Sequence, residues 1–171
     1  MIEKRKLCVF DFDGTLINTP EGSDEDKQKW ADFYGKPEWP YLGWWGRDES
    51  LDTKVWDMKP LPEVQKAYNV AKSDPSNMVI MLTGRITKQG HLVKNILDSH
   101  GFQFDSYNYK RGGDTLTDKL RTLTHILKTN PSIKDIEMWD DRSEHIEPFY
   151  EWGEKLKEAG VIDSFYVNHV K

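Results

Sequence analysis

The chain has 171 residues, 37% hydrophobic and 31% charged, a composition typical of a soluble globular protein with a sizeable core. Its formal net charge of −5 argues against a protein that coats nucleic acid, although it leaves room for a local basic groove. The sequence shows no apolar stretch of membrane-spanning length and no apolar signal segment, so we expect one cytoplasmic domain over residues 1–171. The single cysteine, Cys8, excludes an intrachain disulfide and has the pattern of a small buried hydrophobe.

The first predicted element is a buried strand, Leu7–Phe10, which runs directly into an acidic turn. Asp11 and Asp13 follow the strand, and Gly14 lets the chain turn away at once. In open α/β sheets, the carboxyl end of a central strand is where ligands bind. Two carboxylates this close repel each other unless a hard cation such as Mg²⁺ joins them, and that cation also binds phosphate oxygens. The alternative is an acidic turn without a ligand.

A small insertion follows this strand, at roughly residues 20–60. The charged segment Glu21–Lys29 predicts a short helix, with Ser23 as its cap. Five of the seven tryptophans fall between Trp30 and Trp56, in a stretch rich in turn residues. We expect these aromatic side chains to form a satellite core that holds the insertion closed, and favour this over an aromatic surface for a base, a sugar or a partner. One or two rings can serve both purposes.

Strands and helices alternate through the rest of the chain, which predicts a Rossmann-like parallel sheet of about five strands with helices on both faces. In order, we expect a helix from Pro62, a strand over Met78–Leu82, a helix carrying Ile86 to His100, a strand over Phe102–Tyr109, a helix carrying Leu116 to Leu127, a strand over Ile133–Trp139, a helix capped by Ser143, and a last strand over Val161–Val167.

Three of the predicted strands end in residues that can carry chemistry. The first ends in the acid pair, the second in Thr83, and the fourth in Asp140 and Asp141, while Lys119 lies near the start of the preceding helix. Adjacent strands are roughly 4.8 Å apart, so these groups can meet in one pocket. Acids for a metal, donors for phosphate oxygens and a nucleophile fit phosphoryl transfer. The alternative for the last acidic pair is a charge pattern at a helix start.

These four groups resemble, in order and spacing, the motifs of the haloacid dehalogenase (HAD) superfamily of Asp-dependent phosphatases. The resemblance extends from the first strand to at least Arg142, which is most of the chain. The matching segments are Asp11-Phe12-Asp13-Gly14-Thr15-Leu16, Leu82-Thr83-Gly84-Arg85, Lys119 and Asp140-Asp141-Arg142.

The resemblance implies a role for each motif. Asp11 is expected to attack phosphorus and form an aspartyl-phosphate, and Asp13 to protonate the leaving group and later activate water. The hydroxyl of Thr83, with backbone N–H groups at a following helix start, is expected to bind phosphate. Lys119 is expected to offset charge on the transferring group. Because no proline follows Lys119, Lys110 and Arg111 remain competitors for its role.

The resemblance also implies one Mg²⁺ ion as the cofactor. Asp11, the backbone carbonyl of Asp13 and one acid of the last pair are expected to hold it. Asp140 is favoured as the direct ligand because it follows the strand immediately, with Asp141 binding through water.

Two shorter resemblances bear on the substrate. Gly43-Trp44-Trp45, the second motif, and Trp139-Asp140-Asp141-Arg142 followed by His145-Ile146 resemble the HAD branch called Swiss Army Knife RNA repair-like. The ending of the fourth motif also resembles the phosphatase half of phage polynucleotide kinase–phosphatases. The insertion lies where the superfamily places its cap, and so small a lid would admit the end of a polymer.

These resemblances imply a phosphatase acting on 3′-phosphate ends of RNA or DNA. Arg85, Lys110 and Arg111 are expected to meet substrate phosphates, with a solvated rim as the alternative. Trp44 or Trp45 can stack on a base.

Other functions remain open at this point. One is a phosphatase of small metabolites or nucleotides on the same scaffold. Another is a non-catalytic HAD-fold module that binds partners through the Trp-rich insertion, against which the intact acid pair counts. A signalling receiver domain is disfavoured because the last acidic pair follows the lysine, and the sequence has no Gly-rich Walker loop for a kinase. We expect a structural role for His145 and expect Arg142 to hold Asp141 in place.

Overall fold

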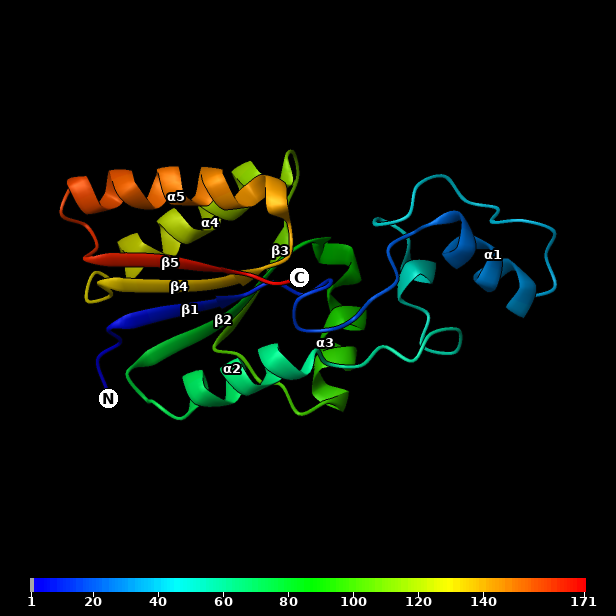
Figure 1. Ribbon diagram of the computed structural model, residues 1–171, viewed down its shortest axis with the longest axis horizontal. Coiled ribbons are helices and arrows are strands. Elements are labelled where there is room, and N and C mark those ends of the chain that lie inside the picture. The colour runs from blue at the N-terminus through cyan, green and yellow to red at the C-terminus, as the bar shows by residue number, and fades with distance from the viewer. Residues whose placement is uncertain (1) are drawn as a thin grey trace.

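The structure, a computed structural model, describes residues 2–171 and contains one five-stranded parallel sheet (Figure 1). The strand order is β3-β2-β1-β4-β5, and every neighbouring pair is parallel. This confirms the predicted sheet. The strands are β1 (Lys6–Phe10), β2 (Asn77–Ile86), β3 (Ser106–Lys110), β4 (Asp135–Asp140) and β5 (Ser164–His169).

Helices cover both faces of the sheet, as predicted for an α/β fold. In Figure 1, α4 and α5 lie above the sheet, α2 and α3 lie below it, and α1 belongs to a smaller lobe on the right. Two short 3₁₀ turns complete the elements. The helical elements are α1 (Asp24–Phe33), η1 (Asp48–Leu51), α2 (Pro62–Lys72), η2 (Thr87–Gln89), α3 (Gly90–Ser99), α4 (Thr115–Thr129) and α5 (Ser143–Glu158).

Strand β1 lies at the centre and contributes to the core on both faces. Leu7 and Val9 pack in the cluster beneath α4 and α5, whereas Cys8 and Phe10 pack in the cluster on the opposite face. This division follows from the two-residue period of a strand, because successive side chains point to opposite faces. Burial raises the pKa of the Cys8 thiol to about 11, as suits a buried hydrophobe.

The order of the strands places the topological switch point between β1 and β4. From β1 the chain passes to β2 and β3 on one side and then returns to β4 and β5 on the other. Phe10 pairs with Met81 of β2 and with Trp139 of β4, so the carboxyl ends of the three central strands are level. Such a crevice is the usual ligand site of an open α/β sheet.

The insertion forms the smaller lobe, and its aromatic residues are buried together. Ser23 caps α1 as predicted, because its Oγ accepts a hydrogen bond from the Asp26 N–H at 3.1 Å. Trp30, Trp44 and Trp56 are buried, and the rings of the last two meet edge to face at 5.5 Å. The cluster is continuous with the core beneath the sheet. The expectation of a separate satellite core was therefore wrong in that respect.

Several element boundaries differ from the prediction. β2 extends through Ile86, which pairs with Lys110 after a register shift, so Ile86 belongs to the strand and not to the helix. The next α-helix begins only at Gly90. Ser143 is the first residue of α5 and does not cap it, because Arg142 occupies the cap position without a side-chain hydrogen bond.

Three strands begin later than the sequence predicted, and β4 is one of them, since it begins at Asp135 and not at Ile133. β3 begins at Ser106, because Phe102 and Phe104 insert their rings into the core before the strand starts. β5 begins at Ser164. None of the helices within residues 2–171 is long and apolar enough to cross a membrane.

The contact between Gly22 and Trp44 gives a test of how the insertion is held. A Cβ at Gly22 would lie 2.5 Å from Trp44 Cγ, and Gly22 has a φ of +83°. We expect Gly22→Ala to lower the free energy of unfolding by about 2–4 kcal/mol, through backbone strain and overpacking together. Urea unfolding followed by tryptophan fluorescence measures this loss.

Gly35→Ala is the matched control. Gly35 has a φ of +66°, but nothing lies within 4 Å of an added Cβ. We expect it to lose only the strain, about 1–2 kcal/mol. Equal losses in the two variants would mean that the Trp44 contact does not hold the insertion.

Candidate active site

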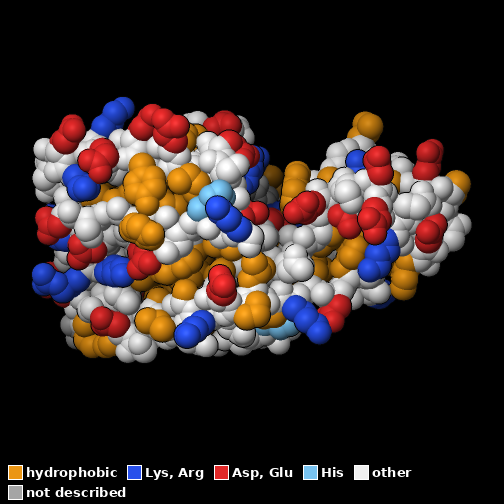
Figure 2. All heavy atoms as spheres, in the orientation of Figure 1, with side chains coloured by type: hydrophobic (Ala, Val, Ile, Leu, Met, Phe, Trp, Pro, Cys, Tyr) orange, Lys and Arg blue, Asp and Glu red, His pale blue; other side chains and the backbone are white. Residues whose placement is uncertain are grey.

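A cavity of about 500 Å³ opens at the carboxyl edge of the sheet, between the two lobes. Figure 2 shows charged side chains of both signs where the larger lobe meets the smaller one. Asp11, Asp13, Lys119 and Asp141 line the cavity from the larger lobe, and Trp45 lines it from the insertion. The structure therefore brings together the acids and the lysine that are far apart in the sequence.

Lys119 is the cation that contacts the acids. Its Nζ lies 3.1 Å from Asp11 Oδ1 and 2.8 Å from Asp140 Oδ2, and all three side chains are buried. Thr15 completes the surroundings of Asp11, since its hydroxyl donates to Oδ2 at 3.1 Å. Of the three cations considered for the third motif, Lys119 is the one in position to balance charge on Asp11.

The two acids at the end of β4 have different surroundings. Asp140 is buried, with one oxygen bound to Lys119 and the other accepting the Arg142 backbone N–H at 2.9 Å. Asp141 is partly exposed and lines the cavity. The Asp141 carboxylate can occupy this position only because residue 14 is glycine, since a Cβ on Gly14 would lie 2.4 Å from Asp141 Oδ2. Of the pair, Asp141 therefore presents its carboxylate to the cavity, although the sequence favoured Asp140.

The crowding of carboxylates shifts the ionisation of this site. Burial raises the pKa of Asp11 well above its usual range; Lys119 opposes the shift, and Asp140, Asp141 and Asp13 add to it. Burial likewise raises the pKa of Asp141, against the effect of its hydrogen bond with Asp11. Burial acts to lower the pKa of Lys119, but the two carboxylates in contact raise it, so Lys119 is held as the ammonium ion.

The donor set fits a hard divalent cation. Asp11, Asp140 and Asp141 each offer an oxygen atom, and these atoms all lie within 4.8 Å of one another. Carboxylate oxygens are the ligands that Mg²⁺ and Ca²⁺ prefer. A cation here would neutralise the repulsion that otherwise raises the pKa of the acids.

Arg85 ties Asp13 to the insertion. Its Nε and Nη2 donate to the two oxygens of Asp13 at 3.0 and 2.8 Å, and its Nη1 donates to the carbonyl of Trp45 and the hydroxyl of Ser50 at 2.8 and 2.6 Å. Arg85 is only 2% exposed, so the alternative of a solvated rim is wrong for this residue. Sequence reasoning missed Ser50, which lies in a stretch without regular spacing.

Thr83 and Gly84 lie at the register shift of β2. Thr83 is buried, and its Oγ1 accepts the Arg85 backbone N–H at 3.0 Å. Gly84 lines the cavity, and a Cβ there would lie 2.8 Å from Thr115 Cγ2. Because α3 starts only at Gly90, the helix N-terminus expected beside Thr83 is absent from that position.

The remaining basic residues separate into two groups. Lys110 lines the cavity and donates to Thr115 Oγ1 at 3.2 Å, whereas Arg111 is exposed and lines a different hollow beside α4. Neighbours at a strand end point in opposite directions, which explains the difference. Arg142 also lines the cavity, but its guanidinium binds Glu144 at 2.8 Å and does not hold Asp141.

His145 is buried one turn into α5, with its ring edge to face against Phe149 at 5.8 Å. Burial lowers its pKa, and Arg142 and Lys119 add to the effect. His145 does not line the cavity, which agrees with the structural role expected for it.

The sheet order and the acids at its switch point define a HAD-like α/β protein. Residues 35–171 match the family described as HAD domain family 1 in Swiss Army Knife RNA repair proteins. The chain belongs to this family, which confirms both the superfamily and the branch indicated by the motifs.

Relatives with known sequences or structures agree with this assignment. The uncharacterized protein YMR265C of Saccharomyces cerevisiae is 24% identical over 165 aligned positions, and the match covers 84% of this chain and 36% of the yeast protein. A chain of the Pnkp1/Rnl/Hen1 complex is 14% identical with a TM-score of 0.56, covering 98% of this chain and 47% of that one. The chain thus spans about a third to a half of these relatives.

Two smaller structures match over most of their own length. The HAD domain of the effector protein Lem4 from Legionella pneumophila is 13% identical, with a TM-score of 0.55, covering 99% of this chain and 88% of that domain. The haloacid dehalogenase-like protein SP0104 from Streptococcus pneumoniae is 15% identical, with a TM-score of 0.54, covering 95% and 93%. At such identities the likeness shows the fold.

The raised pKa of Asp11 predicts how stability depends on pH. Unfolded aspartate has a pKa of about 3.9, so between that value and the raised one the folded protein binds more protons than the unfolded chain. The free energy of unfolding of metal-free protein should therefore fall as pH rises through this window. Stabilisation by Mg²⁺ should grow over the same window, reaching about 2.7 kcal/mol at 100 times its Kd.

Thermal unfolding in chelator and in Mg²⁺, from pH 4 upward, measures both slopes. Asp11→Asn removes the titrating group, so the variant should lose this part of the pH dependence and most of the Mg²⁺ effect. If the variant and the unaltered protein gave parallel curves of stability against pH, Asp11 would not be the source of this pH dependence.

Proposed function

We propose that this protein is a Mg²⁺-dependent phosphomonoesterase that forms an aspartyl-phosphate on Asp11. The convergence of Asp11, Asp141 and the buried Lys119 on one cavity carries this proposal. A carboxylate nucleophile, a fixed cation beside it and a second acid within reach are the groups that phosphoryl transfer requires.

In the first step an oxygen of Asp11 forms a bond to phosphorus and the bond from phosphorus to the ester oxygen breaks. Asp13 gives a proton to the departing oxygen. Lys119 and Thr15, which both donate to Asp11, keep its carboxylate in place. In the second step Asp13 takes a proton from water, the water oxygen attacks phosphorus, and inorganic phosphate leaves with Asp11 restored.

Asp13 is held in position for both steps. Arg85 donates to its two oxygens, and the Thr19 hydroxyl donates to Oδ1 at 2.8 Å. Asp13 therefore keeps a fixed orientation at the cavity wall, which favours proton transfer to a bound group over transfer to bulk water.

The oxygens of Asp11 and Asp141, together with the backbone carbonyl of Asp13, would hold Mg²⁺. Asp140 does not line the cavity and binds Lys119, so it would add its charge to the site and support the other acids through that lysine. When bound, the ion supplies positive charge to the phosphate oxygens. Gly84 and Arg85 would form the wall on the β2 side, with Gly84 allowing close approach of the phosphate to the backbone. Thr83 is buried and would support this wall, since its Oγ1 accepts the Arg85 backbone N–H.

For the substrate, we propose a 3′-phosphate at the end of a nucleic-acid strand. The family is described from RNA repair proteins, and a neighbour with a similar fold comes from an RNA repair complex. The insertion is also smaller than an independent domain, which would leave room for a substrate whose other end lies outside the cavity. A phosphatase of small phosphate esters on the same fold is the alternative, and comparison of a 3′-phosphorylated oligonucleotide with glycerol phosphate separates the two.

Replacement of the nucleophile gives the direct test. We expect Asp11→Asn to lower Mg²⁺-dependent phosphate release from a generic aryl phosphate by about 10³-fold or more. Phosphate release is measured colorimetrically with and without chelator. Full turnover in this variant would remove Asp11 from the nucleophile's role.

Asp13→Asn should behave differently from Asp11→Asn. Because the proposed contact of Asp13 with the metal is through its backbone, we expect turnover about 10²- to 10⁴-fold slower with Mg²⁺ affinity retained. Calorimetric titration of Mg²⁺ measures the affinity. Loss of metal binding in the variant would show that its side chain is a ligand.

A further inference from the structure

We propose that the cavity contains a nucleotide subsite, in which a base stacks on Trp45 and the phosphate on the 5′ side of that nucleotide meets Lys110. The inference rests on the proposed function, because it takes the scissile 3′-phosphate to lie beside Asp11. It assigns two residues that line the cavity from different parts of the chain, one from the insertion and one from the end of β3.

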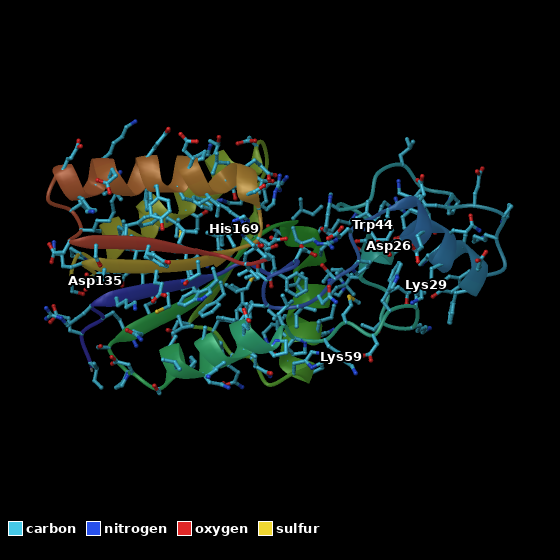
Figure 3. All side chains as sticks on the ribbon, in the orientation of Figure 1. Asp26, Lys29, Trp44, Lys59, Asp135 and His169 are labelled. Atoms are coloured by element: carbon cyan, nitrogen blue, oxygen red, sulfur yellow. The ribbon has the colours of Figure 1, made fainter. Side chains whose placement is uncertain are left out.

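Trp45 differs from the buried tryptophans of the insertion. Trp30, Trp44 and Trp56 are 4%, 6% and 8% exposed, whereas Trp45 is 49% exposed and lines the cavity. Trp44 lies inside the insertion beside α1, where its indole N–H donates to the Pro20 carbonyl (Figure 3). Of the two adjacent tryptophans, Trp45 is therefore the one with aromatic surface available to a base.

Two buried side chains hold the backbone of Trp45 in place. Its carbonyl accepts hydrogen bonds from Arg85 Nη1 at 2.8 Å and from Gln89 Nε2 at 2.9 Å, and both donors are buried. The centroid of its ring lies 5.0 Å from Arg85 Cζ. An aromatic ring on an anchored backbone loses little conformational entropy when a base stacks on it.

Lys110 also lines the cavity, and its charge is available to a substrate. Its Nζ donates to Thr115 Oγ1 at 3.2 Å, and within residues 2–171 it forms no ion pair with a carboxylate. Lys119, in contrast, is committed to two acids. A lysine without a carboxylate at the wall of a cavity suits a substrate phosphate that is not the one being transferred.

Trp45 and Lys110 together indicate the chemical class of the substrate. An aryl or sugar phosphate would use the acids alone, and a free nucleoside 3′-phosphate would add the indole of Trp45. A strand end uses both the indole and the ammonium of Lys110. The cavity of about 500 Å³ is within the range of about 300–1,000 Å³ found for ligand sites.

Binding to the Asp11→Asn protein tests this without turnover. The probes are a fluorescently labelled oligonucleotide with a 3′-phosphate and an otherwise identical one whose last nucleotide lacks its base. Adding Trp45→Ala should raise Kd for the first by about 5- to 150-fold and leave the second nearly unchanged. Trp45→Phe should restore part of the difference.

Adding Lys110→Ala to the same protein should reduce the slope of log affinity against log salt by about 0.7 for the oligonucleotide. It should not change the slope for a nucleoside 3′-phosphate, which has no phosphate on its 5′ side. Matched controls are Phe33→Ala, an exposed aromatic residue at the end of α1 that does not line the cavity, and Lys128→Ala, an exposed cation in the last turn of α4.

The results separate the two proposals. Equal weakening of both oligonucleotides by Trp45→Ala, no weakening, or no binding of either would overturn the subsite, even if phosphate release from other esters stands. Base-dependent binding in a protein that releases no phosphate from any ester would support the subsite and refute the phosphatase.

Discussion

The structure depends on how three carboxylates, those of Asp11, Asp140 and Asp141, are accommodated with the ammonium group of Lys119 at the ends of two buried strands. Asp11 follows β1 and Asp140 ends β4, and Lys119 is placed between them at 3.1 and 2.8 Å. One ammonium group cannot balance the charge of three carboxylates in a region shielded from water. Burial, together with the neighbouring carboxylates, therefore raises the pKa of Asp11. The fold accepts an unfavourable arrangement of negative charge that a bound divalent cation can relieve. This is the property expected of a site that binds charge and not of a structural ion-pair cluster.

The insertion is joined to this arrangement through Arg85. A single buried guanidinium donates to Asp13, to the Trp45 carbonyl and to Ser50. Any movement of the insertion that separates Trp45 from β2 must therefore also break a contact within the group that orients Asp13. Because the aromatic cluster of the insertion is continuous with the core of the larger lobe, such movement is opposed by apolar packing as well. These contacts favour a fixed position for the insertion, which then serves as a wall of the cavity and not as a mobile lid.

The parts of the site that the sequence could predict are those set by local chain geometry. An apolar strand followed at once by Asp11 and Asp13 needs only the two-residue period and a turn, and alternating elements bring the ends of parallel strands to one edge. The choice between Lys110 and Arg111 could not be made, because it depends on where β3 ends to within one residue. The sequence leaves the choice between Trp44 and Trp45 open for a related reason, since an irregular loop offers no period from which to infer the direction of a side chain.

The ion pair of Arg85 with Asp13 could not be predicted from the sequence for a different reason. A helix carrying Ile86 was expected to follow Thr83-Gly84-Arg85, and Arg85 was expected to meet a substrate phosphate, with a solvated rim as the alternative. Instead the strand continues with a register shift to Ile86, and Arg85 points into the protein. Tertiary pairing with β3 thus overrode the local signal of a glycine.

The glycine of the first motif shows how a short sequence pattern can carry a long-range constraint. Gly14 has a φ of +67°, which alone favours glycine, but the nearest neighbour of an added Cβ would be Oδ2 of Asp141 at 2.4 Å. Asp141 lies on another strand end, 127 positions further along the numbering (141 − 14). A side chain at position 14 would push away the one acid of the β4 pair that faces the cavity, while leaving Asp140 and Lys119 in contact. The requirement for glycine beside Asp13 is therefore a condition on the distance between acids as much as on the turn itself.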